Sequence, residues 1–220
     1  DGKVFAYLKT LTLYDDNEEH YVYGKPELKD LSHFDIILMR QDPPFNLSYI
    51  TATHLLEKLS KTTLIVNDPC SVRNAPEKIF VTKFFEIMPK TIITRNINEI
   101  NNFKSKYKDI IIKPLYGNGG EGVFHINEEN DNFNSIVEIC FKQYEEPLIV
   151  QEFIPEVING DKRIILIDGE VVGAVNRIPK VGESRSNMHV GGKPEKTKLT
   201  NHEIKICEKI SQDLKNNNLF

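Results

Sequence analysis

The chain has 220 residues, of which 40% are apolar and 27% are charged, and its formal net charge is −4 at pH 7. These proportions are typical of a soluble globular protein with a core of ordinary size. No apolar run approaches the length of a membrane span. The mild negative charge argues against non-specific nucleic-acid binding, so any anion site must come from local placement of lysine and arginine.

Three isolated cysteines, Cys70, Cys140 and Cys207, show no CxxC spacing. This arrangement fits a reducing compartment better than a disulfide framework or a zinc site. We therefore expect a cytoplasmic protein whose cysteines are buried apolar residues or inert thiols.

Strands and helices alternate in the first part of the chain. Short apolar runs at 35–40 and 63–67 predict buried parallel strands. Between them, residues 48–61 predict an amphipathic helix with Ser48 as its cap. Residues 74–80 carry a proline in what reads as the first turn of another helix.

The alternation continues through the second part. Strands are predicted at 91–94, 109–115 and 147–153, and helices at 96–107 and 133–144. A hairpin is then expected around Asp168-Gly169, with strands at 162–168 and 170–175, and an amphipathic helix at 201–215. The fold class is therefore α/β or α+β.

The two ends suggest a piece of a longer protein. The chain starts at Asp1 without an initiator methionine, and a polar helix tail turns apolar at 218–220, where a strand would normally begin. We expect three segments: a partial N-terminal α/β domain at 1–73, a central lid domain at 74–153, and a truncated C-terminal domain at 154–220.

The stretch between Lys113 and Val123 is rich in glycine. Gly117, Gly119 and Gly122 match the literal G-x-G-x-x-G pattern, which in a dinucleotide-binding fold would open a helix. The residues that follow alternate and favour β-structure, so we predict a hairpin instead. A glycine-rich hairpin beside a strand lysine is suited to close over ATP phosphates. The alternative is a glycine-rich turn that binds no ligand.

Two lysines and one strand end are the next candidates. Lys78 lies one turn into a helix, and Lys113 follows three isoleucines, so its charge must leave the core toward a cleft or meet an anion. Each lysine by itself is more often a solvated surface residue. The strand that ends at Gln151 and Glu152 precedes a proline, and its backbone could read an adenine, although it could equally run into a simple turn. Asp161 is placed to bind ribose hydroxyls.

Arg163, Arg177 and Arg185 fall within a short span near the predicted lid. Guanidinium groups suit phosphate and carboxylate oxygens, so three of them suggest an anionic transition state; surface salt bridges are the alternative for any one. Residues 182–192 lack strand or helix periodicity and have glycine at both ends. This favours a loop that covers substrate.

These residues together resemble the prokaryotic glutathione synthetase family, within the ATP-grasp superfamily. The resemblance covers nearly the whole chain and rests on seven motifs in the family's order. They are Leu38–Phe45, Asn67–Pro69, Pro76–Phe80, Ile111–Leu115 with Gly117–Gly122, Gly160–Arg163, Asn176–Pro179 and Arg185–Gly192. The run from Arg185 also resembles ligases that add glutamate to ribosomal protein tails. The paired prolines at 43–44 point to glutathione synthetase.

The resemblance implies a role for each matching residue. Lys78 and Lys113 would hold ATP phosphates, and Asp161 would bind ribose. Arg40 and Asn187 would lie near the substrate. The glycines of the lid turn would be Gly117, Gly119 and Gly120; the adenine hinge would be Gln151, Glu152, Phe153 and Ile154; the arginines facing the transferred phosphoryl group would be Arg163, Arg177 and Arg185.

The implied activity is ATP-dependent ligation of γ-glutamylcysteine and glycine through an acyl phosphate, giving glutathione, ADP and phosphate. The resemblance also implies that the magnesium ligands, an Asp and a Glu-x-Asn pair, lie beyond Phe220. Glu203, Glu208 and Asp213 read instead as the solvated face of a helix. We therefore expect no metal ligand in this chain, and no turnover by residues 1–220 alone. The alternatives are another ATP-grasp carboxylate–amine ligase, of the glutamate-adding type, and a non-catalytic nucleotide-binding module. The family's habit suggests a homo-oligomer.

Overall fold

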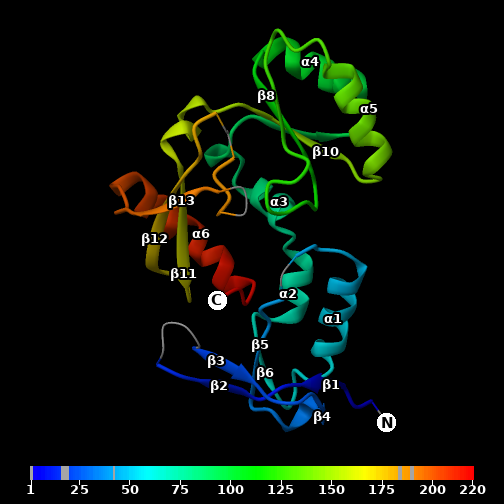
Figure 1. Cartoon of the computed structure of the whole chain (residues 1–220), viewed down its shortest axis with the longest axis vertical. Coiled ribbons are helices and arrows are strands. Elements are labelled where there is room, and N and C mark those ends of the chain that lie inside the picture. Colours follow the sequence, from blue (N-terminus) through cyan, green and yellow to red (C-terminus); the bar gives the residue numbers. More distant parts are fainter. Residues whose placement is uncertain (1, 16–19, 42, 183–184, 189–190) are drawn as a thin grey trace.

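The computed structural model describes residues 2–15, 20–41, 43–182, 185–188 and 191–220. Asp42 and the pair His189-Val190, which belong to the motifs above, lie outside the described residues, as does part of the predicted loop at 182–192. Figure 1 shows three groups of elements, with the N-terminal group (blue and cyan) and the central group (green) at opposite ends of the molecule. Within the described residues, no helix is long and apolar enough to cross a membrane.

The N-terminal group contains three two-stranded sheets. Its buried residues include Val4, Leu31, Leu59 and Ile65, with the short helix η1 (Leu31–His33) beside them. The strand pairs are β1 (Phe5–Leu8) with β4 (Glu27–Asp30), β2 (Leu11–Leu13) with β3 (Tyr21–Tyr23), and β5 (Ile36–Leu38) with β6 (Leu64–Val66).

β5 and β6 pair in parallel, as predicted, but the prediction that both are buried is wrong. Ile65 is buried and packs with Leu59, whereas Ile36, Leu38 and Leu64 are 56%, 65% and 59% exposed. Side chains of a strand alternate between two faces, so one face of this pair packs into the core and the other is exposed. The apolar runs correctly indicated that these segments are strands. They did not indicate that only one face of each strand is buried.

α1 (Leu47–Glu57) is capped by Asn46, whose Oδ1 accepts from the backbone N–H of Tyr49 at 3.1 Å. The expected cap, Ser48, lies inside the helix. α2 (Pro69–Asn74) starts with a proline after its cap Asp68, and α3 (Glu77–Phe80) follows Pro76. The predicted single helix start at 74–80 is therefore the end of α2 and all of α3. A 3₁₀ segment, η2 (Val81–Ile87), leads on to the central group.

The central group is a four-stranded antiparallel sheet with two helices on one face. The strand order is β7-β10-β8-β9, and the helices are α4 (Ile97–Tyr107) and α5 (Phe133–Gln143). The strands are β7 (Thr91–Thr94), β8 (Ile110–Pro114), β9 (Phe124–Ile126) and β10 (Leu148–Glu152). Ile110, Ile112, Ile126, Leu148 and Val150 point toward the helices and form the core.

The glycine-rich segment joins β8 and β9 as an antiparallel hairpin, with Ile110 opposite Ile126 and Ile112 opposite Phe124. No helix begins at Gly119–Gly122, where the chain forms turns. The hairpin prediction is confirmed and the dinucleotide-binding alternative is rejected, because a Rossmann turn must open a helix whose N-terminus meets the pyrophosphate.

The C-terminal group is a three-stranded antiparallel sheet packed on one helix. A short helix, η3 (Pro155–Asn159), precedes β11 (Asp161–Ile167) and β12 (Glu170–Ile178), which form the predicted hairpin; β13 (Lys193–Lys196) pairs with β12. α6 (Asn201–Asn216) starts with a capping box between Thr200 and Glu203, and Lys162 of β11 pairs with Glu203 at 2.7 Å.

Candidate functional site

The sheet of the central group presents one face to helices and the other to the candidate site. Lys113 and Ile111 of β8 alternate with the core residues, so they lie on the face opposite α4 and α5. Gln151 of β10 pairs with Ile111 in the strand register and shares that face. The alternation of β8 therefore turns Lys113 away from the core and into a cavity.

A cavity of about 210 Å³ lies under the glycine-rich hairpin. Lys78 of α3 and Lys113 of β8 line it together, although they are far apart in the sequence. The remaining lining is mostly the turn itself with a polar residue from the C-terminal group; these residues are Gly117, Asn118, Gly119, Gly120, Glu121 and Asn187, with Glu77, Pro114 and Val123. Two ammonium groups and a turn rich in backbone N–H groups make a setting for an anion.

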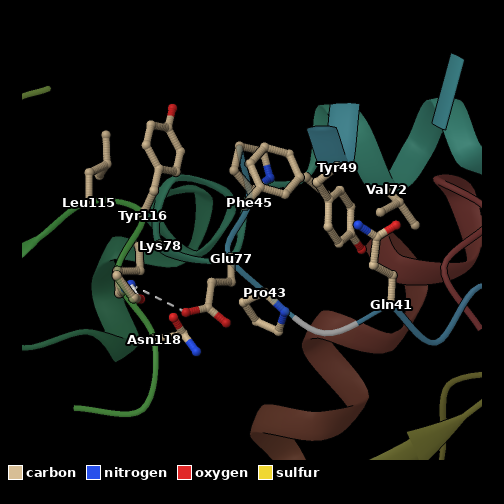
Figure 2. A pocket seen from close by; sticks show the side chains of 13 residues that line it. Gln41, Pro43, Phe45, Tyr49, Val72, Glu77, Lys78, Leu115, Tyr116 and Asn118 are labelled. Carbon is tan, nitrogen blue, oxygen red and sulfur yellow. Dashed lines mark hydrogen bonds and ion pairs between the residues drawn. The ribbon is translucent and has the colours of Figure 1, made fainter. Parts of the chain in front are cut away.

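Lys78 forms a hydrogen bond with the glycine-rich turn. Its ammonium donates to the backbone carbonyl of Gly117, and its Nζ lies 3.5 Å from Oε1 of Glu77. The side chain of Lys78 is 19% exposed, whereas that of Glu77 is 81% exposed. Figure 2 shows this pair at one end of a neighbouring pocket, joined by a dashed line. An incoming anion would therefore compete with a well-hydrated carboxylate for Lys78.

The surroundings of Lys113 disfavour its positive charge. Burial lowers the pKa of its ammonium below the ordinary lysine value, the positive charge of Lys78 lowers it further, and Glu77 partly offsets both effects. The charged form is thus disfavoured in the free protein. A bound phosphate would relieve this, because an anion close to the ammonium favours its protonated state.

A second cavity, of about 280 Å³, continues from the first. The two share Lys113, Val123 and Asn187 in their linings, so they adjoin one another. The second is lined by Gln151, Glu152, Phe153 and Ile154 at the end of β10, with Ile111, Asp161, Arg185 and Ser186 among the others. All four predicted hinge residues therefore meet in one wall.

Two backbone N–H groups of this wall already donate hydrogen bonds to neighbouring strands or their ends. The N–H of Glu152 donates to the carbonyl of Lys90 at 2.9 Å, and the N–H of Phe153 donates to the carbonyl of Asp109 at 3.0 Å. The edge is therefore not as open as the sequence suggested at these two residues. In the described part of the chain, the N–H of Ile154 has no backbone acceptor, which leaves it available to a base. The side chain of Gln151 donates to Oγ1 of Thr91 at 2.7 Å.

The turn and the following loop of the C-terminal group are in contact. Gly120 has a φ of +85°, and a methyl group there would lie 2.9 Å from Oδ1 of Asn187. The guanidinium of Arg185 donates to the carbonyl of Gly120 at 3.1 Å. Arg185 and Asn187, both predicted from the sequence, are thus brought directly over the cavity.

Asp161 and Arg177 form an ion pair, which the sequence did not indicate. Nε of Arg177 lies 2.6 Å from Oδ1 of Asp161, and Nη2 lies 2.5 Å from Oδ2. Asp161, whose carboxylate is held in this pair, is one of the residues that line the second cavity. A carboxylate has about four lone-pair positions, so the pair leaves room for a further donor such as a hydroxyl group.

Arg163 and Arg40 are not brought to these cavities. Arg163 lies two residues after Asp161 on β11, on the same face of the strand, but it is exposed and lines neither cavity. Arg40 follows β5 in the N-terminal group and is also exposed. The geometry brings Lys78, Lys113 and Asp161 to two adjoining cavities and leaves Arg163 outside their linings.

A third pocket, of about 170 Å³, opens between the N-terminal group and the glycine-rich hairpin. Figure 2 shows Phe45 between Tyr49 and Tyr116; the ring centroids of Phe45 and Tyr116 are 5.9 Å apart. The motif at 38–45 was the one sequence signal for this pocket, and the partner Tyr116 could not be inferred. Glu77, Lys78, Gly117 and Asn118 line both this pocket and the cavity under the turn.

The described residues do not fit a metal site. Among them, no group of three or more His, Cys, Asp or Glu side chains is arranged so that it could hold a metal ion. Divalent magnesium requires oxygen ligands in a near-octahedral arrangement.

Similar proteins identify the fold. D-cycloserine synthetase DcsG superposes with a TM-score of 0.66 at 12% identity, over 86% of this chain and 68% of that one. An ATP-grasp RimK domain protein from Sphaerobacter thermophilus gives 0.60 at 18% identity, over 82% of this chain and 64% of that one. The chain has the ATP-grasp fold, as predicted.

The family follows from the sequence. The N-terminal domain of prokaryotic glutathione synthetase matches residues 1–73, and the ATP-grasp domain of the same family matches 77–220. Glutathione synthetases of Agrobacterium fabrum and Brucella melitensis are each 52% identical over 215 residues, which are 98% of this chain and 67% and 69% of those proteins. The chain belongs to the prokaryotic glutathione synthetase family.

Proposed function

We propose that this protein joins γ-glutamylcysteine and glycine in an ATP-dependent reaction that yields glutathione, ADP and phosphate. The observation that carries the proposal is the pair of adjoining cavities between Ile154 and Lys78. One is lined by the strand end at 151–154, where the N–H of Ile154 has no backbone acceptor among the described residues, and the other has two ammonium groups beneath a glycine-rich turn. This order suits a nucleotide with its base at the hinge and its phosphates under the hairpin.

The nucleotide-binding residues follow that order. Gln151, Glu152, Phe153 and Ile154 border the base, and Asp161 accepts from a ribose hydroxyl. Lys113 and Lys78 contact the phosphates, and the turn formed by Gly117, Gly119 and Gly120 lies above them. Positive φ values at Gly119 and Gly120, of +64° and +85°, let the backbone approach the phosphates without a side chain in the way.

The arginines serve the reaction itself. A carboxylate is a poor electrophile, and phosphorylation by ATP gives it a leaving group that the glycine amine can displace. Arg177 and Arg185 neutralise the anionic phosphoryl group during both steps, with Arg177 oriented by Asp161. Asn187, which lines both cavities, contacts the γ-glutamylcysteine. The protein mainly positions the reactants and balances charge.

Magnesium accompanies ATP in this proposal and would neutralise charge on the phosphates. Among the described residues, no group of three or more His, Cys, Asp or Glu side chains could hold it. We also propose the division of residues 74–220 at Phe153, a cytoplasmic location and a homo-oligomer. No contact with nucleic acid is expected from a net charge of −4.

The test is an assay of ADP release by the full-length enzyme with γ-glutamylcysteine and one of several amine acceptors. Glycine should support turnover, whereas glutamate and glutamate-ended peptides should not. Turnover with glutamate instead of glycine would assign the protein to the glutamate-adding ligases. Calorimetry of residues 1–220 with ADP tests nucleotide binding separately from the reaction.

A further inference from the structure

His125 of β9 stacks on Phe153 of the hinge. The ring centroids are 3.9 Å apart and the ring planes are inclined by 24°, so the two rings lie nearly flat on one another. Phe153 lines the second cavity, whereas His125 lies outside that lining and is exposed. The imidazole therefore contacts a ring of the cavity wall without lining the cavity itself.

Strand register explains how the two rings meet. His125 pairs with Ile111 on β8, and Ile111 pairs with Gln151 on β10, so all three share the cavity face of the sheet. Phe153 lies two residues after Gln151 and is tied by its N–H to Asp109, so its ring falls on the same face. The two rings reach across β8 from opposite neighbouring strands.

The backbone bond of Phe153 fixes its main chain and leaves its ring free to turn. In the part of the chain that the structure describes, His125 is the aromatic ring that contacts Phe153. A flat stack restricts the rotation of both rings, and aromatic pairs contribute stabilisation beyond the area they bury. Without His125, the Phe153 ring could swing away from the cavity or into it.

We propose that His125 is a positioning residue of the nucleotide site, which holds the Phe153 ring as a wall of the adenine cavity. The inference rests on the proposed function, because it assumes that the second cavity receives the adenine of ATP. His125 acts through Phe153 and through the face of its ring, so the contribution requires a flat ring and does not require an imidazole nitrogen.

Calorimetric titration of residues 1–220 with ADP and with pyrophosphate separates this role from a general effect on the fold. His125→Ala should weaken ADP binding about 5-fold and leave pyrophosphate binding unchanged, since the phosphates lie in the other cavity. His125→Phe should restore ADP affinity to within about twofold of the wild type. His202→Ala, which removes an exposed histidine on α6, is the matched control and should bind ADP as the wild type does.

Three results would overturn the inference: unchanged ADP affinity in His125→Ala, equal losses in His125→Ala and His125→Phe, or a parallel loss of pyrophosphate affinity. The second would assign the effect to an imidazole nitrogen, and the third to general damage. The proposed function fails differently: the wild-type chain itself would then show no affinity for ADP, whatever the variants do.

Discussion

Asp161 and Arg177 face each other across β11 and β12 and form a bidentate ion pair, with contacts of 2.6 Å and 2.5 Å. The carboxylate borders the cavity assigned to the nucleotide, and the guanidinium belongs to the group assigned to the reaction. A planar guanidinium with two of its donors held by one carboxylate keeps a fixed orientation. In the proposed site, the pair would connect nucleotide binding to charge neutralisation through one rigid contact.

Arg177→Ala in the full-length enzyme should lower kcat by about 100-fold and change the KM for ATP much less, because a group that stabilises developing charge acts mainly in the transition state. Steady-state kinetics with varied ATP measure both constants. Arg177→Lys is the matched control: it keeps the charge but loses the two-donor contact, so it should recover only part of the rate. A large rise in KM with unchanged kcat would place Arg177 in ground-state ATP binding instead.

Lys113→Met should make the fold more stable and the nucleotide site weaker. Methionine keeps most of the length of the side chain and removes a charge whose burial is unfavourable, as the lowered pKa of Lys113 indicates. Losing one charge-assisted contact to phosphate should reduce ADP affinity by about 10-fold or more. Thermal unfolding and calorimetry measure the two effects. A variant that is less stable, with ADP affinity intact, would remove Lys113 from the phosphate site.

The lowered pKa of Lys113 also predicts that, in alkaline solution, the stability of the fold rises with pH while the affinity for ADP falls. The unfolded chain keeps this proton up to the ordinary value of 10.5, whereas the folded chain releases it earlier, so the unfolded state binds more protons in that interval. The destabilisation by Lys113 is fully present below its lowered pKa and disappears as the pH rises toward 10.5. Bound phosphate favours the protonated ammonium, so ADP affinity should fall over the same interval.

Calorimetry of ADP binding in two alkaline buffers with different protonation enthalpies should therefore detect proton uptake on binding. Lys113→Met is the reference, since other groups titrate in this range and only the difference between the two proteins belongs to Lys113. Equal proton uptake by both proteins would show that phosphate does not lie beside Lys113.

The elements of the central sheet could be predicted because their signals are local. β7 agrees with the predicted strand at 91–94, and Asn96 caps α4 where the predicted helix begins. The glycine-rich turn between two apolar runs was enough to indicate a hairpin. Asn46 was missed as the cap of α1 because a nearby Ser48 fits the same rule, and the choice depends on where the backbone leaves its extended conformation.

The Asp161–Arg177 pair could not be predicted because it depends on a β-bulge. A regular two-residue turn at Asp168-Gly169 pairs Ile167 with Glu170 and would place Asn176 opposite Asp161. The register shifts by one residue between Ile165 and Leu166, and this brings Arg177 opposite Asp161 instead. A shift of one residue changes which side chains meet on each face, and the sequence carries no clear signal for it.

Gly120→Ala tests whether the turn must fit closely against the C-terminal loop. At a φ of +85°, alanine should cost about 1–2 kcal/mol of stability, since L-residues are strained in the left-handed region. The added methyl group would also lie 2.9 Å from Oδ1 of Asn187 and 3.3 Å from Cδ of Arg185, so it should displace both residues over the cavity. We therefore expect ADP affinity to fall by about 10-fold.

Gly169→Ala is the matched control for Gly120→Ala. Gly169 has a similar φ of +72° at the β11–β12 turn, and the atom closest to an added methyl group there is Cε of Lys215, at the far end of a flexible side chain. It should lose comparable stability and keep its ADP affinity, because the turn is remote from the cavities. Thermal unfolding and ADP calorimetry on both variants give the comparison. Equal ADP affinities would mean that the contact of Gly120 with Arg185 and Asn187 does not shape the phosphate site, and that strain alone explains the need for glycine.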